Sequence, residues 1–247
     1  MLMIRQRVFR AVAMVLIAGA AIAPAAGEAR AQANGQAGDW VTIGRTYDEQ
    51  FFSPLDKIND KNIAGLGLAW FKNIGTSRGL ESHPLVVDGV MYNTTPFNIV
   101  SAYDAKTGEE LWTYDPEVDR GFTRITCCDV VTRGLAYWKG KVIVATLDGR
   151  VIAIDSGTGT PVWSINSFAD APDWPYTITG APRVFDGKVL IGNAGADLGV
   201  RGFVTAYDAE TGRKLWRFFT VPGDPKLGFE NAAMEMAAKT WTGEWWK

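Results

Sequence analysis

The chain has 247 residues, with 25 lysines and arginines against 27 aspartates and glutamates, and a formal net charge of −2. This length is enough to bury a sizeable core. No basic patch marks the sequence, so we exclude nucleic acid as a partner. Ten tryptophans are a high count for this length, and their positions lead to the predicted fold.

Residues 1–33 are typical of a secretory signal peptide. Three arginines precede an apolar stretch at 11–23, and small residues with overlapping A-x-A patterns end the region. This order of basic, apolar and small residues marks a signal peptide. The apolar stretch is shorter than the roughly 20 residues of a membrane-spanning helix, and Pro24 follows it. We therefore expect export, with a mature chain at 34–247 that carries a net charge of −5.

One pattern occurs three times further along the chain: an alternating strand, a D-x-x-T-G turn and a second strand that ends in tryptophan. The tryptophan-to-tryptophan periods are 51 and 53 residues, close to one propeller blade and too long for leucine-rich, ankyrin or tetratricopeptide repeats. Aspartate suits this turn because its carboxylate accepts hydrogen bonds from nearby backbone N–H groups, and glycine accepts a positive φ. The three segments are 101–112, 152–163 and 205–216.

Another pair of β-rich runs precedes each of these hairpins. The runs lie at 84–92, 134–146 and 182–192, with turns at Asp88-Gly89, Lys139-Gly140 and Asp186-Gly187. A turn of this type between β-rich runs predicts a hairpin. Each period then holds four strands, as a blade requires.

A partial unit that ends in Trp70 precedes the first complete one. We therefore predict an all-β fold, a partial β-propeller of about three and a half four-stranded blades. An open arc of blades leaves an unpaired strand edge at each end. For this reason we also expect the chain to be truncated at its C-terminus.

The repeated hairpin resembles the tryptophan-docking motif of the eight-bladed quinoprotein dehydrogenases, in which one tryptophan per blade is wedged against the next blade. A sharper resemblance is the string T-C-C-D-V-V-T-R-G at 126–134. It is similar to a string of the PQQ-dependent alcohol dehydrogenases, above all the periplasmic ethanol and methanol dehydrogenases. The similarity covers about 39–247 and implies the N-terminal part of such a propeller.

Cys127 and Cys128 are the only cysteines of the chain. An even number of cysteines in an exported protein normally pairs. A bond between adjacent cysteines closes no loop and contributes little through chain entropy, which indicates a local role. The resemblance implies a vicinal disulfide bond that lies over one face of PQQ. A chance pair of buried thiols is the alternative.

The resemblance implies further contacts to the cofactor. Glu81 would bond the quinone, Arg133 would bind a PQQ carboxylate, and Thr179 would lie at the cofactor. Backbone N–H groups of Gly195 and Ala196 would hold another carboxylate, and Ala194, in the same segment, would also bind the cofactor. Three carboxylates need arginine, hydroxyl and backbone donors in a desolvated slot, and these residues supply them.

Asp197 stands where the family usually has a glutamate that ligates calcium. Its side chain is one methylene shorter. Calcium accepts oxygen ligands at about 2.3–2.6 Å in flexible geometry, so the shorter carboxylate could coordinate through one oxygen or through water. The metal implied is calcium or a lanthanide. A plain loop carboxylate is the alternative.

The function implied by the resemblance is oxidation of a primary alcohol to an aldehyde in the periplasm, by hydride transfer to metal-activated PQQ. Cytochrome c or a quinone would accept the electrons. The general base is expected beyond Lys247, so this chain would hold part of the site and no catalytic residue. Association of identical copies stays open. Two alternatives are a non-enzymatic propeller scaffold of the outer-membrane assembly type and an inactive truncated product.

Overall fold

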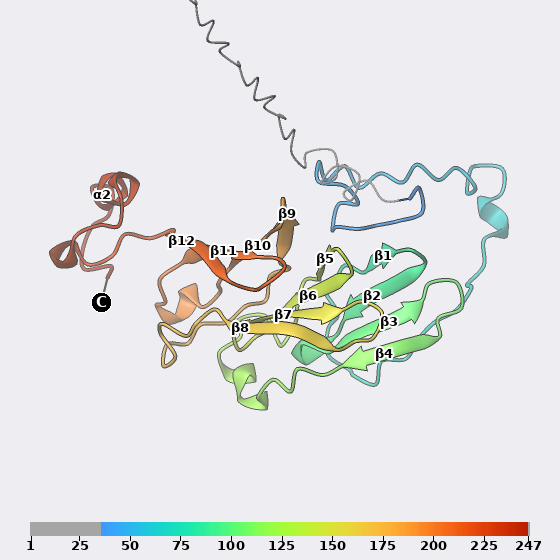
Figure 1. The fold of residues 1–247 in the computed structure, drawn as a ribbon, viewed down its shortest axis with the longest axis horizontal. Coiled ribbons are helices and arrows are strands. Elements are labelled where there is room, and N and C mark those ends of the chain that lie inside the picture. The colour runs from blue at the N-terminus through green and yellow to red at the C-terminus, as the bar shows by residue number, and fades with distance from the viewer. Residues whose placement is uncertain (1–35, 247) are drawn as a thin grey trace, which may run out of the picture.

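The computed structural model describes residues 36–246, and the signal peptide predicted at 1–33 lies outside them. The described residues form three four-stranded sheets, each built from four strands that are consecutive in the sequence (Figure 1). Every pairing within a sheet is antiparallel. The predicted all-β, partial propeller is confirmed. Within 36–246, no helix has the length and apolar character needed to cross a membrane.

The sheets succeed one another along the chain. The first contains β1 (Leu85–Val87), β2 (Val90–Thr94), β3 (Val100–Asp104) and β4 (Glu110–Tyr114). The second contains β5 (Ala136–Trp138), β6 (Lys141–Ala145), β7 (Arg150–Asp155) and β8 (Pro161–Asn166). The third contains β9 (Arg183–Phe185), β10 (Lys188–Gly192), β11 (Phe203–Asp208) and β12 (Lys214–Phe219).

Short helices lie before the first sheet, between strands of a sheet, between sheets and after the last sheet. The 3-10 turns are η1 (Ile63–Gly65), η2 (Pro96–Asn98), η3 (Arg120–Arg124), η4 (Ala196–Leu198) and η5 (Pro225–Leu227). The α-helix α2 (Ala232–Ala238) lies apart from the sheets, toward the C-terminal end (Figure 1). Its N-cap is Asn231, whose side chain accepts a hydrogen bond of 3.0 Å from the backbone N–H of Met234.

The first hairpin of each sheet turns at the predicted dipeptide. In the first sheet, Asp88 and Gly89 have φ values of 51° and 79°. Two successive positive φ values define the type I′ turn, whose twist matches that of the flanking strands. The same signs occur at Lys139-Gly140 and Asp186-Gly187.

The aspartate of each D-x-x-T-G turn accepts hydrogen bonds from residues two and three positions ahead. The Oδ1 atom of Asp104 accepts hydrogen bonds from the Thr107 N–H at 2.7 Å, the Thr107 hydroxyl at 3.0 Å and the Lys106 N–H at 2.9 Å. The bond from the Thr107 backbone, followed by that from its hydroxyl, lowers the pKa of Asp104. Asp155 and Asp208 make the corresponding bonds in the other two sheets.

Each hairpin tryptophan that has a following sheet packs against the turn of that sheet. Trp112 donates a hydrogen bond of 2.9 Å from Nε1 to the Ser156 carbonyl oxygen. Its ring covers Gly159 so closely that an added Cβ would lie 2.8 Å from it. Equivalent contacts join Trp70 to Ala105 and Gly108, and Trp163 to Ala209 and Gly212. Trp216, in the third hairpin, is 46 % exposed.

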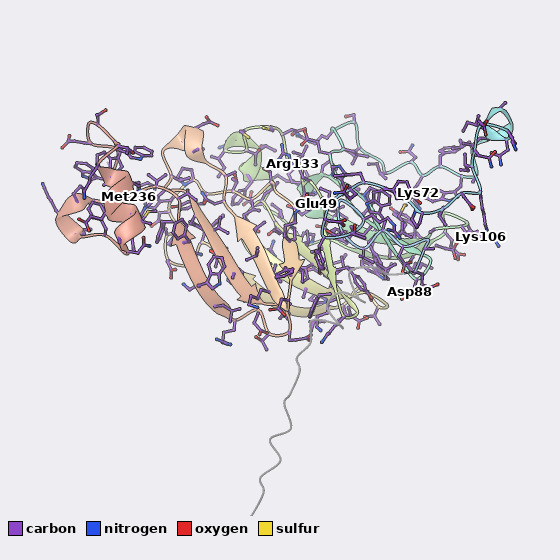
Figure 2. All side chains as sticks on the ribbon, turned by 90° about the horizontal axis from the view of Figure 1, so that it is seen from above. Glu49, Lys72, Asp88, Lys106, Arg133 and Met236 are labelled. Atoms are coloured by element: carbon purple, nitrogen blue, oxygen red, sulfur yellow. The ribbon has the colours of Figure 1, made fainter. Side chains whose placement is uncertain are left out.

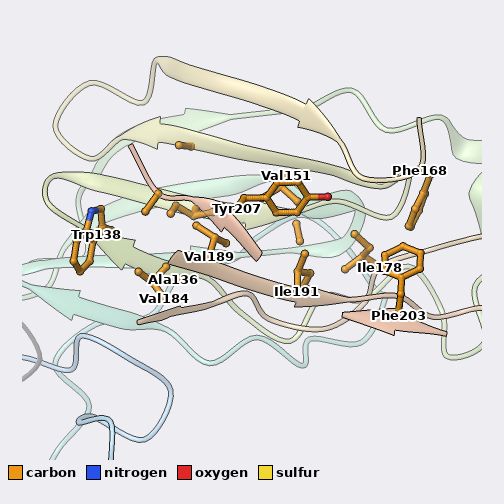
Figure 3. Close-up of a cluster of buried hydrophobic side chains, with 14 of the residues drawn as sticks. Ala136, Trp138, Val151, Phe168, Ile178, Val184, Val189, Ile191, Phe203 and Tyr207 are labelled. Atoms are coloured by element: carbon orange, nitrogen blue, oxygen red, sulfur yellow. The ribbon is translucent and has the colours of Figure 1, made fainter. Parts of the chain in front are cut away.

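The core lies between the sheets. Strand β7 sends Val151 and Ala153 into the cluster shared with the third sheet (Figure 3). It sends Ile152 and Ile154 into the cluster shared with the first sheet. Because side chains alternate along a strand, the middle sheet is buried on both faces. Its four β7 side chains named here have no exposed surface.

Candidate functional site

The site begins in the segments that precede β1, β5 and β9. These segments hold equivalent positions in three successive sheets, so they meet at one end of the blades. Arg133 is their meeting point and lies near the middle of the molecule (Figure 2). Its guanidinium forms an ion pair of 3.0 Å with Glu81 and donates a hydrogen bond of 2.8 Å to the Thr179 hydroxyl.

Backbone bonds hold the same three segments together. The Arg133 N–H donates to the Thr179 carbonyl oxygen at 3.0 Å, and the Arg133 carbonyl oxygen accepts from the His83 N–H at 3.4 Å. The predicted residues Glu81 and Thr179 therefore both contact Arg133, although about fifty residues of sequence separate each of them from it. Sequence analysis gave His83 no role.

A cavity of about 420 Å³ opens beside Arg133. Thr179 and Ala194 also line it. Two backbone hydrogen bonds between Thr177 and Ala194, of 2.7 and 3.3 Å, hold the 193–199 loop against the segment that precedes β9. A space of this volume lies in the range of small-molecule sites.

A second cavity, of about 280 Å³, is lined by Cys127, Gly195 and Asp197 among others. The pKa of the Cys127 thiol is raised, first by its hydrogen bond with Cys128, then by partial burial and by the Cys128 and Asp197 charges. Arg133 acts in the opposite direction on the same thiol. Ala194 lines the first cavity and Gly195, the next residue, lines the second, so the two cavities are neighbours.

The cysteine pair is exposed and unbonded, with the two sulfur atoms 2.6 Å apart. The exposure of both side chains disagrees with the alternative of a buried thiol pair. The vicinal disulfide bond stays a prediction.

Gly195 lines the second cavity and directly follows Ala194, which lines the first. Its φ is 110°, and a Cβ there would lie 2.7 Å from the Pro175 carbonyl oxygen and 2.8 Å from Val200. Only glycine avoids both the strain and the overlap. Ala196 and Asp197 follow in η4. The loop therefore places the Gly195 backbone and the Asp197 side chain at the second cavity.

The donor set fits an anionic cofactor. Arg133 provides a guanidinium fork, Thr179 a hydroxyl and Gly195 a position where backbone can approach a ligand closely. Two further hydroxyls nearby in sequence, those of Thr126 and Thr132, are buried and make no hydrogen bond within the protein. Unsatisfied buried hydroxyls are uncommon, and a bound ligand or water would satisfy them.

A metal would need donors beyond Asp197. Among residues 36–246, no group of three or more His, Cys, Asp or Glu side chains could hold a metal ion. A carboxylate oxygen suits calcium or a lanthanide as one ligand. The remaining ligands would have to come from a bound cofactor or from other groups.

Arg78 and Asp129, which were not predicted as site residues, form a further ion pair between the segments that precede β1 and β5. The order of their charges relative to Glu81 and Arg133 is visible in the sequence. Arg78 precedes Glu81 by three residues, and Asp129 precedes Arg133 by four. This reversal of sign between the two segments is the signal that could have identified them.

Residues 40–247 match the family model described as "PQQ: Glucose/ethanol/alcohol dehydrogenase, beta-propeller domain". Quinohemoprotein alcohol dehydrogenase ADH-IIG of Pseudomonas putida is 57 % identical over 212 residues, which cover 86 % of this chain and 29 % of that protein. The crystal structure of quinohemoprotein alcohol dehydrogenase from Comamonas testosteroni superposes with a TM-score of 0.84 at 52 % identity, over 91 % of this chain and 33 % of that one.

A europium-containing methanol dehydrogenase superposes with a TM-score of 0.75 at 37 % identity, over 86 % of this chain and 39 % of that one. The chain spans about a third of the length of the curated relatives it matches.

Proposed function

Because this chain belongs to the PQQ glucose, ethanol and alcohol dehydrogenase β-propeller family, we propose that it supplies part of the cofactor site of an enzyme that oxidises a primary alcohol to an aldehyde. The single observation that carries the proposal is the convergence on Arg133. Segments that precede three different sheets meet there, beside a cavity of about 420 Å³.

Within that site each residue has a distinct task. Arg133 would bind a PQQ carboxylate through its guanidinium fork, and the contacts with Glu81 and Thr179 orient that fork. The backbone N–H groups of Gly195 and Ala196 would bind another carboxylate, while the Ala194 N–H is donated to the Thr177 carbonyl oxygen at 2.7 Å and holds the loop in place. Cys127 and Cys128, as a vicinal disulfide bond, would cover one face of the ring. The 3.0 Å pair with Arg133 keeps the Glu81 carboxylate beside the same cavity.

Asp197 is proposed as one ligand of a calcium or lanthanide ion. When bound, PQQ supplies a quinone carbonyl that accepts hydride from the alcohol, and the metal polarises that carbonyl as a Lewis acid. The proposal includes a periplasmic location, because of the signal peptide predicted at 1–33, and cytochrome c or a quinone as electron acceptor. Two relatives whose names give these acceptors, 1-butanol dehydrogenase (cytochrome c) of Thauera butanivorans and alcohol dehydrogenase (quinone) of Gluconacetobacter polyoxogenes, support this part of the proposal.

Cofactor binding tests the proposal. The purified chain is titrated with PQQ in the presence of calcium, and its tryptophan fluorescence is recorded. We expect saturable quenching. Arg133→Ala should raise the dissociation constant roughly 10- to 100-fold, because a hydrogen bond to a charged group contributes about 1.5–3 kcal/mol.

Arg213→Ala, in the exposed turn of the third sheet, is the matched control and should bind as the parent chain does. Equal affinity of the Arg133→Ala variant and the parent chain would contradict the assignment of Arg133. Absence of quenching in the parent chain would contradict a cofactor site in this chain.

A further inference from the structure

Two ion pairs of opposite polarity join the same two segments. Arg78 of the first segment pairs with Asp129 of the second, and Glu81 of the first pairs with Arg133 of the second at 3.0 Å. The first segment precedes β1 and the second precedes β5. Because each segment supplies one cation and one anion, a shift of one segment against the other would bring like charges together.

The two pairs differ in what they face. Arg133 lines the larger cavity, and the proposed function gives both Arg133 and Glu81 a contact with the cofactor. Arg78 and Asp129 line neither of the two cavities of the site. The Arg78–Asp129 pair is therefore free to hold the two segments together while Arg133 and Glu81 engage a ligand.

Phe97 makes further contacts with Arg78 and with the residue that follows Asp129. The Arg78 guanidinium lies 5.5 Å from the centre of the Phe97 ring, a distance at which a cation is attracted to an aromatic face. The Phe97 N–H donates a hydrogen bond of 3.1 Å to the carbonyl oxygen of Val130, the residue after Asp129. Phe97 itself is buried. These contacts thus join the exposed Arg78–Asp129 ion pair to the buried side chain of Phe97.

Asp129 needs such support because of its backbone. Its φ is 66°, in the left-handed region, which aspartate adopts more readily than most residues but at a steric cost that glycine does not have. A residue held in this region persists where its surroundings determine it. Asp129 directly follows Cys128, so its backbone direction sets where the two cysteines lie.

We propose that Arg78 and Asp129 are positioning residues, which hold the Cys127–Cys128 pair at the cofactor face without touching the cofactor. The inference rests on the proposed function, and it assigns a task to two residues that the proposed site did not include. The side chains of Arg78 and Asp129 are 41 % and 37 % exposed. An ion pair this exposed adds little to global stability, so its loss should alter the cysteine geometry more than the melting temperature.

The test compares Arg78→Gln, Asp129→Asn and the exchanged pair Arg78→Asp/Asp129→Arg. One readout needs no cofactor: the rate at which an aromatic disulfide reagent modifies the fully reduced Cys127 and Cys128. The other is the dissociation constant for PQQ. Each single variant should change both by about tenfold, as loss of a supporting partner does at other sites. The exchanged pair should restore at least part of each change.

Lys72→Gln and Glu110→Gln are the matched controls, because that pair is 3.0 Å long with side chains 38 % and 42 % exposed. Neither should change the thiol rate. An Asp129→Asn variant with the parent thiol rate would overturn the inference. A changed thiol rate would also overturn it if the exchanged pair did not restore the rate and the variants had lower melting temperatures. If the parent chain binds no PQQ, the proposed function fails, while the thiol rates still decide the positioning role.

Discussion

Trp112 and Gly159 are in contact across two sheets: the indole ring lies on the glycine, and a Cβ on Gly159 would be 2.8 Å from it. The indole N–H of Trp112 bonds the Ser156 carbonyl oxygen in the same turn. The last strand of one sheet thus fixes the hairpin formed by the last two strands of the next, here β7 and β8. The repeated D-x-x-T-G turn serves as the receptor for this contact, because its glycine leaves room for the ring.

Replacement of this glycine should be destabilising for two separable reasons. Gly159→Ala places a side chain at a φ of 73° and forces it into the Trp112 ring. We expect a loss of about 2–4 kcal/mol in the free energy of unfolding, measured by denaturant titration. Gly89→Ala is the control, with a φ of 79° and nothing within 4 Å of the added carbon. If both variants lose the same amount, the docking contact contributes nothing.

Asn98 should be a stabilising residue that acts between sheets. Its buried side chain donates to the Ala145 carbonyl oxygen at 3.2 Å and accepts from the Leu147 N–H at 2.9 Å. Asn98→Ala leaves both backbone groups without a partner, and we expect a loss of about 2–4 kcal/mol in the same measurement.

Asn62 provides the comparison for Asn98. It also donates one side-chain hydrogen bond to a backbone carbonyl and accepts one from a backbone N–H, but it is exposed. Asn62→Ala should therefore change the free energy of unfolding by about 1 kcal/mol or less. A similar effect of the two variants would show that burial does not set the contribution of Asn98.

Acid should weaken the hairpin turns. The Thr158 backbone N–H, followed by the Thr158 hydroxyl, lowers the pKa of Asp155. A carboxyl whose pKa is lower in the folded state stabilises the fold above its unfolded value, about 3.9, and loses this effect as the pH falls through the folded value. The melting temperature of the parent chain should therefore fall below about pH 4.

Asp155→Asn removes the titrating group and should make this fall in melting temperature less steep. Asp104 and Asp208 stand in the same turn of the other two sheets, and their pKa values are lowered in the same direction. Asparagine at either position should act alike. Parallel curves of melting temperature against pH for the parent and the variants would rule out a contribution of these turns.

Asp197 should limit the affinity for calcium. Asp197→Glu adds the methylene that separates this chain from the family pattern, so we expect tighter calcium binding in the presence of PQQ. Asp197→Asn removes the charge and should weaken it by about tenfold or more. The calcium concentration for half-maximal PQQ binding measures both effects. The control Asp173→Asn, in a separate loop, should leave this concentration unchanged. If both Asp197 variants also left it unchanged, Asp197 would not be a metal ligand.

The sheets could be predicted from the sequence because the turns are local. Asp104 bonds residues two and three positions ahead, so the aspartate, threonine and glycine spacing contains the whole interaction. The site was partly predictable for a different reason: the resemblance picked out Glu81, Arg133 and Thr179, and the structure brings these three into contact. Their roles toward a cofactor stay predictions, and so does the vicinal disulfide bond.

The residues that sequence reasoning missed act over long distances in the chain. Asn98 bonds groups 47 and 49 residues away, and Arg78 pairs with Asp129 across 51 residues. No spacing rule within one segment encodes such a contact, because it exists only once two sheets have packed. For Arg78 and Asp129 the sequence offers only the opposite order of charges in their two segments. The positive φ of Asn98 and Asp129 is likewise imposed by packing and not by a glycine in the sequence.

The burial of the middle sheet on both faces has a consequence for how the molecule opens. Each of the two large core clusters joins two successive sheets, so cooperativity should pass from sheet to sheet, as it does in repeat proteins. Backbone amides of β6 and β7 should exchange hydrogen with solvent only after the opening reaction of highest free energy. Those of β1 and β12, in the two outer sheets, should exchange after openings of lower free energy. A defect at one interface would then uncouple a single flank and leave the other still locked to the centre.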